Sequence, residues 1–229
     1  MVLTWADQWA GGYSIYFVDG VLREGLDMVY ALFRWNTRMV CGRWERDEGS
    51  QVIEAATSDT AGAGLVGLGL GYYLIWDCMV VFDDETADPV TLEWVDTTHN
   101  LIVFGGPFVI SVSKKLESEL GVSLTVNPDG TWTLHTPLGD FDYGGEAYIG
   151  KEDLIYIALV KDHERYILFI MGLTPYGTTA GSQFVRRFLN PWTENMEAMI
   201  GATKAVVKWE ASTPNTVTPS DTWTVLAAG

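Results

Sequence analysis

The sequence predicts an α/β domain with a mixed, largely parallel sheet, helices on its faces and an added β-hairpin, in a three-layer sandwich-like arrangement. Strand-like and helix-like patterns alternate along the 229 residues, and such alternation is typical of β-α-β units, which run parallel and right-handed. Two apolar runs, residues 154–160 and 166–171, have the continuous hydrophobic character of strands that are covered on both faces.

The first half of the chain carries one predicted strand–helix–strand unit. Hydrophobic spacing and turn residues divide this half into a strand at 13–18, an amphipathic helix within 21–39, a short strand at 51–56, a helix at 61–71 capped by residues 57–60, and a buried strand at 76–82. The acidic turn 83–89 closes the unit.

The second half repeats the pattern and adds strands. Its predicted elements are a strand at 100–104, a helix at 108–120 stopped by Gly121, a hairpin at 122–126 and 131–135, a glycine-rich loop at 142–150, strands at 154–160 and 166–171, a helix at 178–189, and a strand at 204–209.

No clear linker divides the chain, so residues 1–211 are expected to form a single domain. Its two halves, 1–85 and 99–211, are predicted to share one sheet, and the stretch 83–98 is the nearest candidate for a linker. Residues 212–229, rich in Thr, Pro and Asn, are predicted to be an extended and loosely held C-terminal tail.

The chain is strongly acidic, with 30 Asp and Glu against 14 Lys and Arg and a net charge of -16. Such a charge repels phosphate backbones and anionic membranes, so neither nucleic-acid binding nor membrane contact is expected. Attraction of cations, or solubility in an extracellular setting, fits the charge better, although many cytosolic proteins are acidic too. The 48% hydrophobic residues indicate a globular protein with a sizeable core.

Cysteines and a possible membrane span give little direct information on function. Cys41 and Cys78 are too few for a disulfide framework or a zinc site, and two free, buried thiols are predicted, although pairing stays open. The N-terminus lacks the pattern of a signal peptide. Residues 64–82 are apolar and of spanning length, but Asp77 and the acidic flank favour a helix followed by a buried strand.

An acidic cluster follows the strand predicted at 76–82. Its members Asp83, Asp84, Glu85 and Asp88 could bind Ca²⁺ or Mg²⁺ through carboxylate oxygens, the only cofactor that the sequence suggests. The spacing is not that of an EF-hand, and a solvated acidic loop is the alternative. Asp140 and Asp142 form a second, smaller group.

Two predicted strand-to-helix turns offer an alternative site for a small ligand. Doubly wound sheets bind ligands at the carboxyl ends of their strands, and helix N-termini expose amides to anions. The candidate residues are Thr57, Ser58, Asp59 and Thr60 in the first turn and Gly105 and Gly106 in the second. No phosphate-binding fingerprint is present, so tight turns that need glycine for their backbone are the alternative.

A catalytic site is not predicted. The three histidines, His99, His135 and His163, do not have the spacing of helical metal ligands, and the hydrolase motif GxSxG is absent. Metal binding by histidine and a nucleophile–base pair are therefore unsupported, and the chain is not expected to be an enzyme.

Three short motifs carry a family resemblance. They are the apolar run 100–104 entering Gly105-Gly106-Pro107, the segment MGLTPYGTTAG at 171–181, and the segment TSDTAGA at 57–63. Over residues 50–190 these motifs resemble archaeal S-layer and S-layer-like cell-surface proteins. The chain departs from that family in having Phe108, Val109 and Ile110 where an Asn is common, in its short length, and in lacking an Asn-x-Ser/Thr glycosylation site.

The resemblance implies a non-enzymatic structural protein of an extracellular layer, sheath or filament. It would assemble with like subunits, as a homo-oligomer, or bind other surface proteins. Two other classes of function stay open: a small-ligand-binding domain with its site at the strand-to-helix turns, and a viral or membrane-associated structural component.

Overall fold

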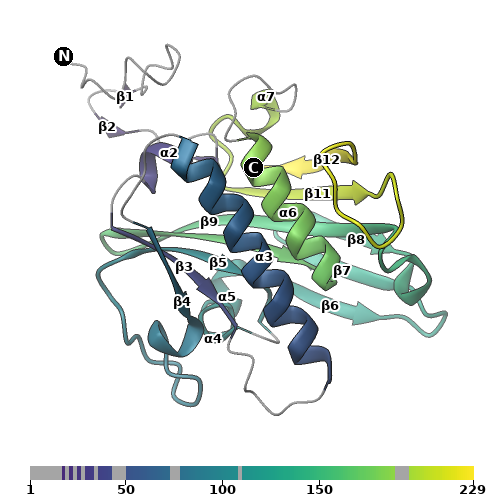
Figure 1. The fold of residues 1–229 in the computed structure, drawn as a ribbon, viewed down its shortest axis with the longest axis horizontal. Helices are drawn as coiled ribbons and strands as arrows, with labels where there is room; N and C mark the ends of the chain where they lie inside the picture. Colours follow the sequence, from purple (N-terminus) through teal and green to yellow (C-terminus); the bar gives the residue numbers. More distant parts are fainter. Residues whose placement is uncertain are drawn as a thin grey trace.

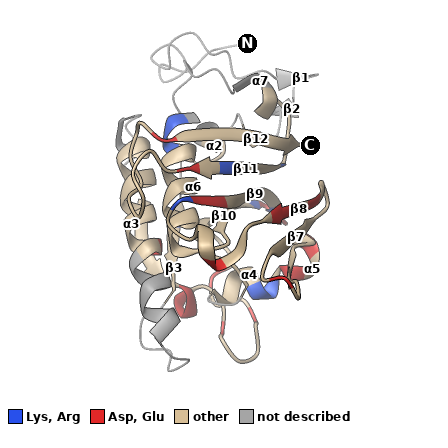
Figure 2. Ribbon diagram, turned by 90° about the vertical axis from the view of Figure 1, so that its right-hand side faces the viewer, with Lys and Arg blue, Asp and Glu red and all other residues tan. Residues whose placement is uncertain are grey.

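A computed structural model describes residues 17–18, 21–22, 25–26, 29–33, 36–42, 50–72, 78–107, 110–188 and 196–229. Its central element is a seven-stranded mixed sheet with the strand order β12-β11-β9-β10-β5-β3-β4 (Figure 1). A three-stranded antiparallel sheet, β6-β7-β8, lies on one side of it and the helices α3 and α6 lie on the other (Figure 2). The predicted α/β class is therefore confirmed.

The strands of the main sheet fall into a parallel and an antiparallel part. The parallel part holds β3 (Thr37–Cys41), β4 (Cys78–Phe82), β5 (Asn100–Phe104) and β10 (Arg165–Gly172). The antiparallel part adds β9 (Glu152–Asp162), β11 (Lys204–Glu210) and β12 (Thr222–Ala228). Only half of the strand pairs are parallel, because a two-residue turn joins β9 to β10 and cannot make a crossover.

The remaining described elements are short strands and helices around this sheet. The strands are β1 (Phe17–Val18), β2 (Val21–Leu22), β6 (Ser123–Val126), β7 (Trp132–Thr136) and β8 (Gly139–Tyr143). The helices are α2 (Val29–Leu32), α3 (Ser50–Tyr72), η2 (Asp83–Glu85), α4 (Ser111–Lys115), α5 (Glu117–Leu120), η3 (Gly145–Tyr148), α6 (Pro175–Phe188) and α7 (Met196–Met199).

Two predictions for the first half of the chain were wrong. The strand expected at 51–56 is the first part of α3, because Gln, Glu and Ala at these positions favour a helix and outweigh the single Val-Ile pair. The helix expected within 21–39 is interrupted, since its last residues form the buried strand β3. The strand–helix–strand unit therefore runs from β3 through α3 to β4. The strand expected at 13–18 lies mainly outside the described residues.

The second half agrees closely with the sequence analysis. The strand predicted at 100–104 is β5, the hairpin is β6 and β7, and the two apolar runs are β9 and β10. The predicted helix at 108–120 is described from residue 110 as α4 and α5 and ends at Gly121, whose φ of 62° is left-handed. Helix α6 begins at Pro175, earlier than expected, since proline suits the first turn of a helix.

The main sheet carries a separate apolar core on each face. Side chains of alternate residues along β9 and β10 point to opposite faces, so both strands are buried on both sides. The core under α3 and α6 includes Phe33, Leu70, Ile155, Phe184 and Trp209, and the core under the three-stranded sheet includes Leu101, Leu120, Tyr156, Phe169 and Leu134. Each fully buried large side chain contributes roughly 1.5–3 kcal/mol to folding.

The stretch 83–98 is a packed loop and not a linker. The guanidinium of Arg165 lies over the ring of Trp94, 4.1 Å from its centroid, and donates a hydrogen bond to the carbonyl of Asp96. The Asp96 carboxylate forms an ion pair with Arg38 Nε at 3.2 Å. These contacts fix the loop to strands from both predicted halves of the chain, which share the main sheet.

Residues 212–229 are not a loosely held tail. Residues 222–228 form β12, which pairs with β11, and Trp223 is buried. The Asp221 carboxylate holds the preceding loop by accepting hydrogen bonds from the Trp209 indole at 2.8 Å and from Ser212 and Thr218. Trp223, Val225 and Ala227 occur at every second position, which is a strand pattern. The prediction of a tail relied on the high content of Thr, Pro and Asn and overlooked this pattern.

The described residues of the apolar stretch 64–82 belong to α3 and β4, and β4 is mostly exposed, so the prediction of a buried strand here was wrong. In the described part of the chain, no helix is long and apolar enough to cross a membrane. Cys41 and Cys78 are not joined in a disulfide, and the first is buried while the second is partly exposed.

Helices α3 and α6 touch at Gly62. A Cβ atom at this position would lie 2.5 Å from Ser182 Oγ and 3.0 Å from Phe104 Cδ1, whereas a Cβ at Gly64, one half-turn on, meets nothing within 4 Å. The close contact of the two helices therefore requires glycine at one position and not at the other.

We expect Gly62→Ala to lower the free energy of unfolding by about 1–3 kcal/mol, because the added methyl group must displace Ser182 or Phe104. The matched variant Gly64→Ala should leave stability unchanged or raise it by up to about 1 kcal/mol through better helix propensity. Urea unfolding of both variants measures the difference. Equal effects at the two positions would contradict this packing.

Candidate functional site

The four parallel strands end at the same edge of the main sheet, which we call the carboxyl edge. It is formed by the ends of β3, β4, β5 and β10 and by the described residues that directly follow these strands. Ligands of open α/β sheets usually bind at this edge. Three buried carboxylates, those of Asp59, Asp83 and Asp153, lie at or next to these strand ends in this protein.

Asp153 closes the turn between β10 and α6. Its Oδ1 accepts a hydrogen bond from the Leu173 amide at 2.9 Å, and its Oδ2 accepts one from the Thr174 amide at 3.1 Å and one from the Thr174 hydroxyl. Donors of this kind at the start of a helix otherwise bind anionic ligands. The carboxylate of Asp153 therefore takes the place that a phosphate occupies in many α/β proteins.

The turn around Asp153 depends on two glycines. A Cβ at Gly177 would lie 2.4 Å from the carboxyl carbon of Asp153, and a Cβ at Gly172 would lie 2.2 Å from the Gly177 carbonyl carbon. Burial raises the pKa of Asp153 to about 7, while its hydrogen bonds oppose this shift. The segment 171–181 is thus shaped around a carboxylate of the chain itself.

Asp83 plays a similar part at the end of β4. Its Oδ2 accepts hydrogen bonds from the amide of Ser111 at 3.0 Å and from the Ser111 hydroxyl at 2.8 Å, at the start of α4. The side chain is completely buried. It therefore connects the β4 end to the segment that follows β5.

Asp59 reaches the end of β3 from helix α3. Its Oδ2 accepts a hydrogen bond from the Gly42 amide at 3.3 Å, and its Oδ1 accepts one from the Ser58 hydroxyl at 3.4 Å. Burial, with a smaller contribution from the Asp83 charge, raises the pKa of Asp59 to about 8. Burial and the nearby Asp59 raise the pKa of the Cys41 thiol to about 12, so this thiol is not a nucleophile at neutral pH.

The ligand residues predicted for the two turns do not form one site. Thr57, Ser58, Asp59 and Thr60 lie well inside α3 and not at a helix start. Gly105 does end β5, with a φ of 106°, but its amide donates to the Ile170 carbonyl and its carbonyl accepts from the Ser113 hydroxyl. The glycine turn at 105–106 is therefore tied to neighbouring backbone and side chains.

The predicted cation cluster is spread over separate contacts. Asp83 bonds Ser111, Glu85 Oε1 accepts the Phe82 amide at 3.1 Å, and Asp88 Oδ1 accepts the amides of Val90 and Thr91. Within the described ranges, no group of three or more His, Cys, Asp and Glu side chains is placed to hold a metal ion. The carboxylates of Asp83, Glu85 and Asp88 thus bond nearby residues of the chain itself.

A row of polar groups crosses the exposed face of the three-stranded sheet. Thr125 Oγ1 lies 2.9 Å from His135 Nε2, and His135 Nδ1 lies 2.8 Å from Asp140 Oδ1. The order hydroxyl, imidazole, carboxylate is that of a catalytic relay, which the sequence analysis did not foresee. Acyl transfer also needs donors for an oxyanion, and the nearby Asn127 amide already donates to Thr131 and Thr133. The contacts of the row join side chains of adjacent strands.

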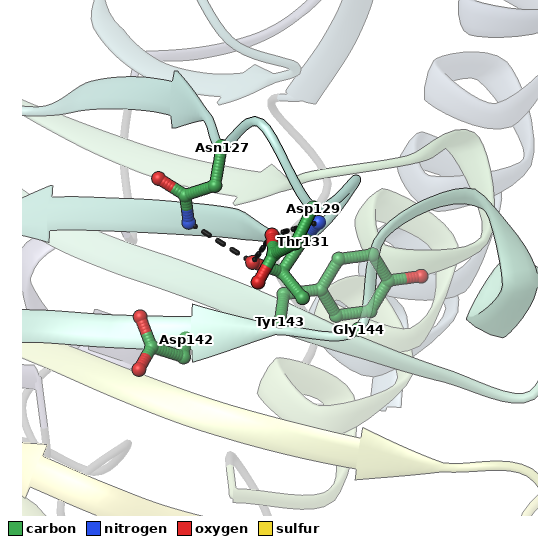
Figure 3. A pocket seen from close by; sticks show the side chains of 6 residues that line it. All are labelled: Asn127, Asp129, Thr131, Asp142, Tyr143 and Gly144. Atoms are coloured by element: carbon green, nitrogen blue, oxygen red, sulfur yellow. Dashed lines mark hydrogen bonds between the residues drawn. The ribbon is translucent and has the colours of Figure 1, made fainter.

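A shallow hollow of about 440 Å³ opens at the end of the same small sheet (Figure 3). Its lining combines an amide, a hydroxyl and two carboxylates, from Asn127, Asp129, Thr131, Asp142, Tyr143 and Gly144. Hydrogen bonds from the Thr131 hydroxyl and amide lower the pKa of the exposed Asp129. The polar groups drawn in Figure 3 mostly bond each other and so shape a turn.

Sequence reasoning missed Asp153, the residue on which the carboxyl edge depends most. It directly precedes the apolar run 154–160, and a carboxylate at the start of a strand is normally expected to be exposed to solvent. One sequence feature could have indicated its role, the Gly-, Thr- and Pro-rich turn at 172–178. The backbone amides of such a turn need a hydrogen-bond acceptor, and Asp153 supplies it to Leu173 and Thr174.

Comparisons with known proteins add no assignment. No protein-family model matches the chain, and no curated protein is similar to it. The resemblance to S-layer proteins therefore rests on the short motifs alone.

The buried Asp59 makes stability depend on pH. Below about pH 4 the carboxyl is protonated in both the folded and the unfolded chain. As the pH rises, the unfolded chain loses the proton first, so folding stability falls until the folded pKa of about 8 is reached. An asparagine side chain at this position would stay neutral at every pH.

We expect Asp59→Asn to gain stability relative to the wild type between pH 5 and pH 8, by at least about 1 kcal/mol. Denaturant unfolding of both proteins at the two pH values measures this change, and Asp129→Asn, at an exposed carboxylate, is the control. A constant difference between Asp59→Asn and the wild type would show that Asp59 is ionised in the folded chain at both pH values.

Proposed function

We propose that this protein is a non-enzymatic structural subunit that assembles with like subunits, or with other surface proteins, in an extracellular layer, sheath or filament. The observation that carries the proposal is a set of exposed apolar side chains in one stretch of the chain. Met79, Val80 and Phe82 in β4 are 63, 53 and 44% exposed, and Val90 and Val95 in the loop that follows are 87 and 61% exposed.

Apolar side chains with this degree of exposure favour contact with another protein. Single exposed apolar residues are common on any surface, but several within one strand and its following loop are typical of interaction sites. The net charge of -16 repels other molecules of the same chain and so opposes contact through these apolar side chains. Assembly is therefore expected to require high local concentration or cations that screen the charge.

The carboxyl edge supports a structural role in a second way. Asp59, Asp83 and Asp153 bond donors of the turns that would otherwise be open to a ligand. Buried polar groups that bond one another stabilise a fixed geometry. Hydrogen bonding of this kind favours a rigid domain that contacts other proteins through its outer surface.

We expect the purified protein to form sheets, tubes, filaments or defined oligomers at high concentration, more readily with Ca²⁺ than with EDTA. Negative-stain electron microscopy and sedimentation velocity measure this. An antibody against the folded chain should also label intact source cells. A protein that stays monomeric under all these conditions would contradict the proposal.

A further inference from the structure

Strand β6 is a free edge of the three-stranded sheet (Figure 1). Among the described residues, it pairs on one side only, with β7, in an unbroken antiparallel register from Ser123 to Val126. Its sequence, SLTV, has no charged residue and no proline. Natural proteins normally protect such an edge with Lys, Pro or a bulge, because free strand edges pair with other chains.

The backbone groups that point away from β7 belong to Leu124 and Val126. The Asn127 amide donates to the Thr131 carbonyl at 2.8 Å, so the backbone of Asn127 faces β7. Hydrogen-bonded positions alternate along each strand of an antiparallel pair, and the amides and carbonyls of Leu124 and Val126 are therefore directed outwards. In the described part of the chain, these outward groups have no hydrogen-bond partner.

The side chains of β6 alternate between an apolar and a polar face. Leu124 lies beside the buried Leu134 of β7, on the face that covers the main sheet. Val126 is on the same face and is 65% exposed, since no described strand lies beyond it. Thr125 points to the opposite, polar face, where it contacts His135.

Other edges of the three-stranded and seven-stranded sheets are better protected. Strand β8, the opposite edge of the three-stranded sheet, carries Asp140 and Asp142. At the end of β4 the Phe82 amide donates to Glu85, and β12 shifts register against β11, which places a bulge at Leu226. Charged side chains, bonded backbone groups and bulges all limit edge pairing, so β6 is the most open of these edges.

We propose that β6 pairs with β6 of a second copy of this chain, antiparallel across a twofold axis perpendicular to the three-stranded sheet. The inference rests on the proposed function, and it names one contact through which like subunits meet. The register that uses all the outward groups sets Leu124 opposite the partner's Val126 and Thr125 opposite the partner's Thr125. Each pair of Leu124 and Val126 then exchanges two backbone hydrogen bonds, and the two small sheets become one.

Charge selects this direction of pairing. Two chains that each carry a net charge of -16 can approach through a strip without charge, and β6 is such a strip. The exposed Glu117 and Glu119 of α5 lie shortly before the strand. Antiparallel pairing separates the two Ser123 residues by about 14 Å along the strands, more than the Debye length of about 8 Å. Parallel pairing would bring the glutamates of the two copies together.

The shortness of β6 favours another copy over a flexible peptide. A peptide would lose backbone entropy on ordering along the edge, and a strand of four residues offers few bonds to offset that loss. A second copy presents a strand that is already ordered, and its apolar side chains extend the face on which Val126 is exposed.

The pairing gives a small contact, so weak association is expected for an isolated pair of chains. A twofold contact closes after two copies, and a layer or filament needs a second kind of contact. The exposed apolar side chains of β4 and of the loop after it provide a surface for that second contact.

Sedimentation equilibrium of the wild type, Val126→Pro and Thr125→Lys tests the pairing. Val126→Pro removes an outward amide but no bond to β7, and Thr125→Lys sets two like charges opposite each other. Each should raise the dimer Kd by about tenfold or more. The control Leu68→Lys adds the same charge at a side chain of α3 that is 64% exposed, and it should leave dimerisation unchanged. Thr125→Lys provides the test alone if Val126→Pro does not fold.

Disulfide crosslinking tests the position of the twofold axis. In a Cys78→Ser background, Thr125→Cys should form a disulfide-linked dimer under mild oxidation, because the Cα atoms of the two opposed residues are expected about 4.5 Å apart. The matched variant Ser123→Cys should not, because its two copies lie about 14 Å apart along the strands. Circular dichroism confirms that each variant is folded before these comparisons.

Each outcome gives a decision. If the wild type self-associates and Val126→Pro and Thr125→Lys associate equally well, the β6 pairing is wrong while the proposed function stands. Equal crosslinking of Ser123→Cys and Thr125→Cys would also overturn the pairing. If the wild type is monomeric at every concentration, with and without Ca²⁺, both proposals fail. Loss of dimerisation in Leu68→Lys as well would show that added charge, and not the β6 contact, is responsible.

Discussion

The hydrogen bonds between the Asp153 carboxylate and the residues before α6 fix the start of this helix to the main sheet. Asp153 belongs to β9, its donors Leu173 and Thr174 follow β10, and α6 begins at the next residue. Helix α6 then packs against α3 at Gly62 and against the sheet at Gly181, where a Cβ would lie 2.7 Å from Ile155. The position of the helical layer thus follows from one buried carboxylate and the glycines around it.

Two further buried carboxyl groups accept hydrogen bonds at the carboxyl edge. Asp59 and Asp83 fix the ends of β3 and β4 with hydrogen bonds of the same kind. Buried carboxylates cost desolvation free energy, which the donors of the turns offset. An edge used in this way contributes rigidity, and the apolar side chains exposed on β4 and on the loop after it are the basis of the proposed assembly.

Sequence patterns predicted the second half of the fold well and the first half poorly. Continuous apolar runs at 154–160 and 166–171 mark buried strands whatever their partners, and Gly121 ends a helix for local steric reasons. The strand at 51–56 was misread because Val52 and Ile53 resemble a strand in a segment whose other residues favour helix. Asp153 could not be predicted as a site residue, because its partners lie twenty and twenty-one residues away and meet it only through the β9–β10 pairing.

The most direct test of the role of Asp153 is thermal unfolding of the wild type and Asp153→Ala with added formate, phosphate and nucleotides at matched ionic strength. We predict that formate, which has the shape of the missing carboxylate, raises the Tm of Asp153→Ala and leaves the wild type unchanged. Phosphate and nucleotides should not stabilise the wild type, because its own carboxylate occupies the donors at the start of α6. A rise in the wild-type Tm with phosphate or a nucleotide would contradict this role, since the carboxyl edge would then be open to ligands.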